Sequence, residues 1–150
     1  MSPAALDRVR CTVPSHPKYL PLVRSVVQEG ASLAGFDTDL TQRILLAVTE
    51  AVTNVIRHAY GGENDKAIEL DVLTRDGELR LDLVDYGEFV DPKYIASRPL
   101  DEIRPGGIGV HLIKSTMDHV AYSRNAHGGT TLTMVKHAAA EKAASKKESQ

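Results

Sequence analysis

Glu50, Asn54 and His58 recur at intervals of four within a segment whose apolar residues have helical periodicity. On a helix this spacing sets them about one turn apart, in a stripe that borders the apolar face. A carboxylate and an amide oxygen one turn apart suit two tasks, accepting a proton and binding a hard cation through oxygen. A solvated polar flank of the helix is the alternative, and a single histidine such as His58 is more often a structural hydrogen-bonding residue.

Asp85 is a second candidate, because it continues the alternation of Leu79, Leu81 and Leu83 and should therefore point toward the core. Burying a carboxylate is expensive unless donors meet it. A ligand with an exocyclic amino group, such as adenine, would supply a donor, and Gly87 leaves room for a planar ring. The alternative is an aspartate at a strand end that turns outward into the following loop.

Two glycine-rich segments complete the candidates. Residues 106–109, Gly-Gly-Ile-Gly, open a predicted helix, where free backbone amides and the helix dipole favour phosphate. This segment matches neither a Walker A loop nor the full dinucleotide fingerprint, and tight-turn glycines are the alternative. Residues 128–131, Gly-Gly-Thr-Thr, also fit the plain turn of a hairpin. Taken in order, the four groups are those that a nucleotide pocket with Mg²⁺ would need.

The segments that carry these groups predict an α+β fold, a two-layer sandwich with helices on one face of a mainly antiparallel sheet. Alternation at Val9, Cys11 and Val13 predicts a half-buried first strand. Ser15 and Pro17 are start signals for a first long helix with an apolar stripe. Gly35 and residues 61–62 are the expected ends of the first and second long helices.

The second long helix should begin at Asp39, with Gln42 as its capping-box partner. Its apolar face runs through Ile44, Val48, Ala51, Val52, Val55, Ile56 and Ala59. Two hairpins are predicted further on, one turning at Asp76-Gly77 and one turning through residues 125–129. A short helix after residues 106–109 precedes the second hairpin.

Composition restricts the class of protein. The chain has 150 residues, 42% of them hydrophobic and 25% charged, with a formal net charge of -2, as in a soluble globular domain. Without a basic stripe and with few aromatic residues, direct binding to nucleic acid is not expected. No segment is apolar enough to span a membrane, and Cys11 is the one cysteine, so we expect a cytoplasmic protein without disulfides.

The predicted domain covers residues 1–137, followed by a tail over residues 138–150 that is rich in Ala, Lys, Glu and Ser. Residues 87–105 form a long irregular segment, and such loops in compact domains are usually functional or mobile.

The motifs together resemble a known family. In order they are Glu50-x-x-x-Asn54-x-x-x-His58-Ala59-Tyr60, Asp85-x-Gly87, Gly107-x-Gly109 and Gly129-Thr130. This pattern resembles the GHKL (Bergerat-fold) ATPase modules, and within them most closely the anti-sigma factor serine/threonine kinases of bacterial partner-switching systems. The resemblance extends from about Val9 to Lys136.

The resemblance implies a bound ATP with Mg²⁺. Asn54 would be the magnesium ligand and Asp85 would accept a hydrogen bond from the adenine amino group, with Gly87 under the ring. Thr130 would lie near the adenine, and His58 would also contact the nucleotide.

The phosphates would be held by Gly107, Gly109 and Val110 at the start of the short helix, with residues 88–105 as a lid. Arg104 could reach the γ-phosphate or a partner, and a solvated surface position is its alternative. Glu50 would be the general base that takes the proton from a serine or threonine hydroxyl of a partner protein.

The implied partners are an anti-sigma factor antagonist with a STAS domain and, in alternation, a sigma factor, with the kinase acting as a homodimer. The pattern departs from the family at Phe89, where a second glycine usually follows Gly87, and this predicts a stiffer lid hinge or weaker nucleotide binding. Two other functions stay open, an ATP-binding module that sequesters a regulator without catalysis and an ATP hydrolase that uses Glu50 to activate water.

Overall fold

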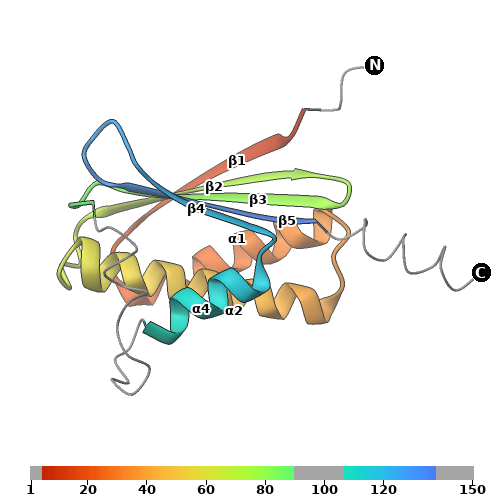
Figure 1. The fold of residues 1–150 in the computed structure, drawn as a ribbon, viewed down its shortest axis with the longest axis horizontal. Helices are drawn as coiled ribbons and strands as arrows, with labels where there is room; N and C mark the ends of the chain where they lie inside the picture. Colours follow the sequence, from red (N-terminus) through yellow and green to blue (C-terminus); the bar gives the residue numbers. More distant parts are fainter. Residues whose placement is uncertain (1–4, 90–106, 138–150) are drawn as a thin grey trace, which may run out of the picture.

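The computed structural model describes residues 5–89 and 107–137, and in this part of the chain five strands form one antiparallel sheet. The strands follow the order β1-β2-β3-β5-β4 across the sheet. Figure 1 shows the labelled helices on one face of the sheet, so the predicted α+β fold is confirmed. The strands are β1 (Asp7–Pro14), β2 (Ala67–Arg75), β3 (Glu78–Asp85), β4 (His119–Arg124) and β5 (Thr130–His137). The α-helices are α1 (Leu20–Leu33), α2 (Thr38–Asn54) and α4 (Gly107–Thr116).

The start of α1 differs from the prediction at Ser15. A short 3-10 turn, Pro17–Tyr19, precedes α1, and His16 caps it by accepting the Lys18 N–H at 3.0 Å. Ser15 is buried instead, and its hydroxyl accepts the backbone N–H of Lys66 at 3.0 Å. Ser15 therefore joins the end of β1 to the segment before β2, while Pro17 does begin the helical turn as expected.

The N-cap of α2 is Asp37, so the prediction of Asp39 was wrong. The side chain of Asp37 accepts the backbone N–H of Leu40 at 2.8 Å, and Asp39 lies inside the first turn. The helix begins earlier because Gly35, with a φ of 87°, reverses the chain directly after α1. Asp37 then has the extended backbone that an N-cap needs.

Both predicted hairpins are present. β2 and β3 pair in register, with Leu70 opposite Leu83, and Gly77 takes a φ of 78° in the turn between them. β4 and β5 pair around a turn in which Gly128 has a φ of 82°. The β3–β5 pairing then sets the end of β3 beside the beginning of β5.

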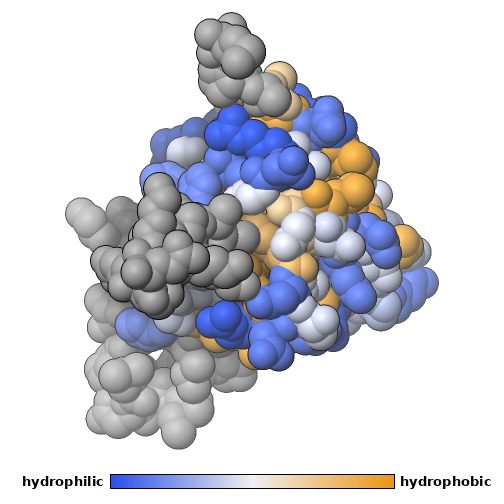
Figure 2. Space-filling view, turned by 90° about the vertical axis from the view of Figure 1, so that its right-hand side faces the viewer, coloured by the Kyte–Doolittle hydropathy of each residue, from blue (hydrophilic) through white to orange (hydrophobic). Residues whose placement is uncertain are grey.

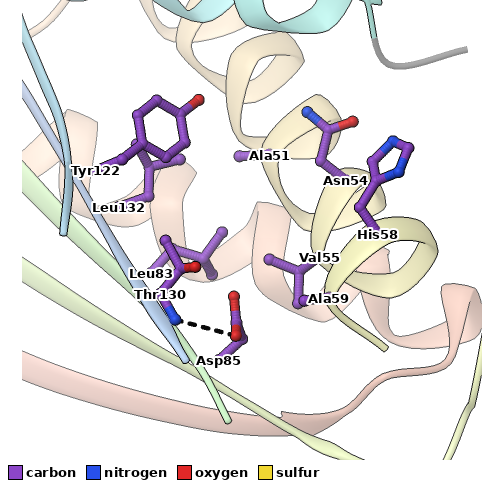
Figure 3. A pocket seen from close by; sticks show the side chains of 10 residues that line it. All are labelled: Ala51, Asn54, Val55, His58, Ala59, Leu83, Asp85, Tyr122, Thr130 and Leu132. Carbon is purple, nitrogen blue, oxygen red and sulfur yellow. Dashed lines mark hydrogen bonds between the residues drawn. The ribbon is translucent and has the colours of Figure 1, made fainter. Parts of the chain in front are cut away.

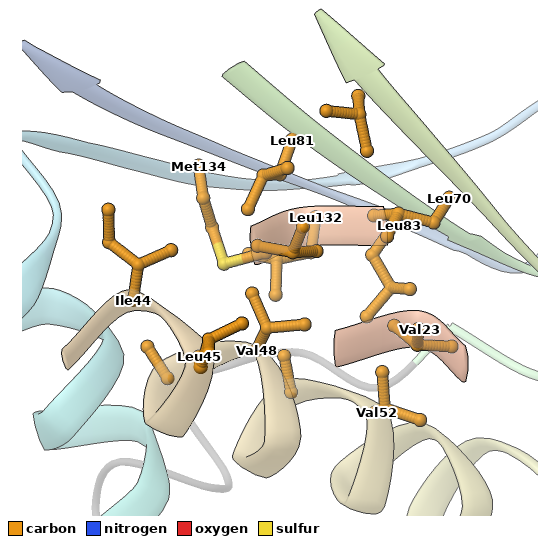
Figure 4. Close-up of a cluster of buried hydrophobic side chains, with 14 of the residues drawn as sticks. Val23, Ile44, Leu45, Val48, Val52, Leu70, Leu81, Leu83, Leu132 and Met134 are labelled. Atoms are coloured by element: carbon orange, nitrogen blue, oxygen red, sulfur yellow. The ribbon is translucent and has the colours of Figure 1, made fainter. Parts of the chain in front are cut away.

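The core lies between the sheet and the helices. Figure 4 shows Ile44, Val48 and Val52 on α2 facing leucines and a methionine from the sheet. Every second residue of β3 is buried, so Leu79, Leu81, Leu83 and Asp85 all point to this side. The alternation read from the sequence therefore holds to the last residue of the strand, and it carries a carboxylate into the layer between sheet and helices.

Apolar side chains reach the surface at the β1 edge of the molecule. A groove between β1, β2 and α1 is lined by apolar groups that include Val9, Val26, Leu33 and Val72. Val9 is 56% exposed, although Val13 on the same face of β1 is buried. Figure 2 shows this apolar area at the end of the molecule that it views. In the described ranges no helix combines the length and apolarity that crossing a bilayer requires.

Candidate nucleotide site

A pocket opens between the C-terminal half of α2 and the inner face of the sheet. It encloses about 470 Å³, including its open mouth. Figure 3 shows the pocket with α2 on one side and side chains of β3, β4 and β5 on the other. Its lining is mostly apolar, and four of its five polar side chains come from the predicted site. The ten lining residues are Ala51, Asn54, Val55, His58, Ala59, Leu83, Asp85, Tyr122, Thr130 and Leu132. The structure therefore brings Asn54, His58, Asp85 and Thr130 together.

Asp85 is buried at one end of this pocket, with 3% of its surface exposed. One carboxylate oxygen accepts the backbone N–H of Gly87 at 3.1 Å and that of Thr130 at 3.2 Å. The other oxygen accepts no hydrogen bond from the described residues, and it points into the pocket in Figure 3. Burial raises the pKa of Asp85 above the ordinary aspartate value, against the lowering effect of the two amides. A donor on a ligand would match the open oxygen.

Asn54 is the last residue of α2, and its amide oxygen is buried. Among the described residues this oxygen has no hydrogen-bond partner. An unsatisfied buried amide oxygen is unusual, because the lost hydrogen bond costs about 1–3 kcal/mol. An oxygen in this state fits a hard cation such as Mg²⁺, which in nucleotide sites takes one or two protein oxygens and completes its shell with phosphates and water.

The helix that carries Asn54 does not continue as an α-helix, contrary to the prediction. Residues Val55–Ala59 form one π-helical turn, in which the N–H of Tyr60 bonds to the carbonyl of Val55 at 3.0 Å. Such turns are rare and often lie at functional sites. The spacing of apolar residues predicted a helix to Ala59. Over a single turn this spacing is too similar in an α-helix and a π-helix to distinguish them.

The glycines serve close backbone packing. A Cβ on Gly87 would stand 2.3 Å from the carbonyl oxygen of Ala59, and one on Gly129 would stand 2.2 Å from that of Asp85. Gly87 is thus required by the approach of β3 to the π turn, whereas the sequence suggested space for a planar ring. Gly129 lets the start of β5 lie against Asp85, so residues 128–131 form both the hairpin turn and a pocket wall.

Two residues of the site were missed by the sequence analysis. Asn125 donates to the carbonyl of Asp85 at 2.8 Å and accepts the N–H of Gly129 at 3.1 Å, so it fixes the hairpin turn onto the pocket. The turn signal at Asn125 was visible, but its long-range partner was not. Tyr122 lines the pocket from β4, and only its place in the alternation of β4 indicated that it faces inward.

The first residues after Asp85 are held by the same hairpin. The backbone N–H of Phe89 donates to the carbonyl of Gly128 at 3.1 Å, and the guanidinium of Arg124 lies 5.2 Å from the Phe89 ring centroid. Phe89 is the residue that stands where a second glycine was expected. Its ring gives Arg124 a surface to cover, which a glycine would not.

Two further predicted residues, Glu50 and Val110, are described and do not line this pocket. Glu50 is half-buried on α2, one turn before Asn54. Gly107 and Gly109 belong to the first turn of α4, which packs against α2, and Val110 in the same turn is buried, with 1% of its surface exposed. Arg104 and nearly all of the predicted lid, residues 88–105, lie outside the described residues.

The sandwich that surrounds this pocket has the architecture of an ATPase domain family. The family model of the histidine kinase-like ATPase domain matches residues 13–136, and the chain belongs to this family. Among its relatives are the serine-protein kinase RsbW of Bacillus velezensis, 28% identical over 141 residues that cover 89% of this chain and 87% of that protein. The RsbW of Listeria monocytogenes serotype 4a is 31% identical over 122 residues, 76% of this chain and 78% of the relative.

A solved structure has the same fold. The crystal structure of the RsbU and RsbW domains of Rv1364c from Mycobacterium tuberculosis superposes with a TM-score of 0.59 over 87% of this chain, at 19% identity. The chain corresponds to 32% of that longer protein, so the likeness concerns the fold of this one domain.

Proposed function

We propose that this chain is an ATP-dependent serine/threonine protein kinase that also acts as an anti-sigma factor. Its substrate is an anti-sigma factor antagonist with a STAS domain, its alternative partner is a sigma factor, and it works as a cytoplasmic homodimer. One observation carries the proposal: Asn54, whose buried amide oxygen has no partner among the described residues, and Asp85, whose second carboxylate oxygen is open, line the same pocket. The names of the relatives support the same activity.

In this proposal each end of the pocket holds one end of ATP. Asp85 accepts a hydrogen bond from the adenine amino group, and Thr130 and His58 lie beside the base. Asn54 offers its oxygen to Mg²⁺, and the amides at the start of α4, near Gly107, hold the phosphates. Bound Mg²⁺ would neutralise charge on the phosphates during transfer.

Phosphoryl transfer also needs a general base, and Glu50 takes this role in the proposal. It lies about 6 Å along the helix axis from Asn54, because four residues at 1.5 Å per residue separate them. No described residue pairs with its carboxylate, so it is available to a partner. Glu50 takes the proton of the substrate hydroxyl as that oxygen bonds to the γ-phosphorus and the bond from phosphorus to the ADP oxygen breaks.

The test is transfer of labelled phosphate from ATP to a purified STAS-domain antagonist. We expect label on the antagonist with the parent chain, and loss of at least about a hundredfold in rate with Glu50→Gln while ATP still binds, as for removal of a general base. Glu29→Gln, the same change at an exposed position on α1, is the matched control and should transfer normally.

The other outcomes distinguish the remaining functions. Free phosphate without labelled antagonist indicates an ATP hydrolase, and ATP binding without either product indicates a non-catalytic module that sequesters a regulator. Near-normal transfer by Glu50→Gln contradicts the role of Glu50 as the base.

A further inference from the structure

The β1 edge of the sheet carries an apolar surface that the described chain leaves uncovered (Figure 2). Val9 on β1 and two leucines of α1, Leu22 and Leu33, are 56%, 54% and 70% exposed. Leu22, Val26 and Leu33 recur with helical spacing, so they form a second apolar stripe on α1 beside the stripe that packs in the core. Val9, Val26 and Leu33 also line the apolar groove between β1, β2 and α1. An apolar surface of this kind usually marks an interaction site.

The outer edge of β1 is open to a further strand. Among the described strands β1 pairs only with β2, and it does so without a bulge over its whole length. From Val9 to Val13 the side chains that face the helices carry no charge. Natural proteins usually protect edge strands with bulges or inward-pointing charges, and this edge has neither over that stretch. It is therefore a template for pairing with another chain.

The backbone groups that would form this pairing can be identified from the end of β1. The backbone N–H of Ser15 donates to the carbonyl of Lys66 at 2.7 Å, which continues the β1–β2 ladder. Hydrogen-bonded and non-hydrogen-bonded pairs alternate along an antiparallel ladder. The backbone groups of Arg8, Arg10 and Thr12 therefore point away from β2, toward the open edge.

A second copy of this chain offers the surface that fits. It presents an open strand edge with an apolar helix stripe beside it, and a two-fold axis brings like parts together. Arg8 and Arg10 bond to Asp71 of their own chain, so part of their charge is already compensated. The tail over residues 138–150 has no large apolar side chain with which to fill the groove.

The charges on β1 select one register for two copies of this strand. A two-fold axis at Arg10 would set the two Arg10 side chains directly opposite each other, which is unfavourable. An axis at Val9 would set Arg8 opposite the partner's Arg10, which is unfavourable for the same reason. An axis at Cys11 sets Arg10 opposite the partner's Thr12, and its overlap is longer than that of an axis at Thr12.

We propose that two copies of this chain dimerise by antiparallel pairing of their β1 strands about Cys11, with the apolar stripes of the two α1 helices covering the junction. The axis is perpendicular to the sheet, so the helices of both copies lie on one face of a continuous sheet. Val9 then lies opposite the partner's Val13, beneath the helices. This inference rests on the homodimer of the proposed function and names its interface. The nucleotide pocket, lined by α2 and strands β3 to β5, stays open in both copies.

The first test is oxidative cross-linking of the full chain with copper phenanthroline. In this register the two Cys11 residues form a non-hydrogen-bonded pair with Cα atoms about 4.5 Å apart, within the range of a disulfide. We expect the parent to form a disulfide-linked dimer through Cys11. A chain with Cys11→Ser and Ser123→Cys carries its cysteine on the opposite edge strand, β4. It is the control for random collision and should cross-link much more slowly.

The second test is the dimer Kd, measured by analytical ultracentrifugation. Leu33→Lys sets a charge in the apolar stripe, and it should raise the Kd at least about tenfold because each dimer contains the substituted position twice. Leu46→Lys is the same change at a leucine of α2 that is 54% exposed. It is the matched control and should dimerise like the parent.

The outcomes separate this interface from the rest of the proposed function. A dimer that does not cross-link through Cys11, or whose Kd is unchanged by Leu33→Lys, overturns this interface and leaves the homodimer standing. A parent chain that stays monomeric up to submillimolar concentration overturns the homodimer as well. Neither result bears on the kinase activity, which phosphate transfer to the antagonist tests independently.

Discussion

The central residue of the site is Asp85, because its charge is expensive to bury and nothing on the described chain uses its second oxygen. Two backbone amides satisfy one oxygen, and burial still raises the pKa of the carboxyl group. A side chain that costs stability in the free protein and faces a pocket is typical of a binding site. Asn54 has the same character, with a buried amide oxygen that lacks a described partner.

Because burying the charged carboxylate of Asp85 costs stability, we predict that Asp85→Asn stabilises the nucleotide-free protein. Since the folded-state pKa of Asp85 is raised, its favourable contribution is full below the unfolded-state pKa and is lost as pH rises through the folded-state pKa. Asparagine at this position is neutral at every pH, so it avoids this loss of stability. Its amide oxygen can accept the same two hydrogen bonds from the backbone N–H groups of Gly87 and Thr130. We therefore expect a higher Tm for Asp85→Asn at pH 7, with a gain that shrinks toward about pH 4.

Thermal unfolding of parent and variant at the two pH values checks this prediction. Asp82→Asn, the same change on the opposite face of β3, is the control and should show no comparable gain at pH 7. A lower Tm for Asp85→Asn at pH 7, in the absence of nucleotide, would contradict the account of its burial.

At the scale of elements, the pocket depends on three segments that approach more closely than side chains permit. The end of β3 lies against the π turn at Gly87, and the start of β5 lies against Asp85 at Gly129. The hydroxyl of Tyr60 adds two backbone contacts, donating to the carbonyl of Ala67 and accepting the N–H of Tyr86 at 2.7 Å. These contacts set the position of Asp85 relative to α2.

Gly129→Ala should therefore destabilise the fold and weaken nucleotide binding together. Its Cβ would meet the carbonyl carbon of Asp85 at 2.8 Å as well as the oxygen, both of them backbone atoms that cannot move cheaply. We expect a loss of about 1–3 kcal/mol in the free energy of unfolding, measured in urea. The neighbouring Gly128→Asn is the control, because Gly128 has open space around it and asparagine tolerates its φ of 82°. Equal stability of Gly129→Ala and the parent would show that the close approach is not required.

At the scale of the whole molecule, the sequence predicts which side chains face the core or the pocket, because this follows from the local periodicity of each strand and helix. The alternation of β3 placed Asp85 in the core layer, and the spacing of Asn54 and His58 placed both at the rim of one pocket, as the structure shows. What it could not predict depends on contacts between distant segments. The shift of the α2 N-cap to Asp37 follows from the reversal after α1, and the place of Tyr122 in the pocket wall follows from strand register.

The most direct test of the account is an amide NMR titration of the full chain with ATP and Mg²⁺. The backbone N–H groups of Gly87 and Thr130 bond to Asp85, so they report on the base end, and those at the start of α4 report on the phosphate end. We predict large saturable shifts at both ends and none at Val9 and Leu33 in the groove beside β1. Shifts confined to that groove, or no shifts at millimolar ATP, would contradict the claim that this pocket binds the nucleotide.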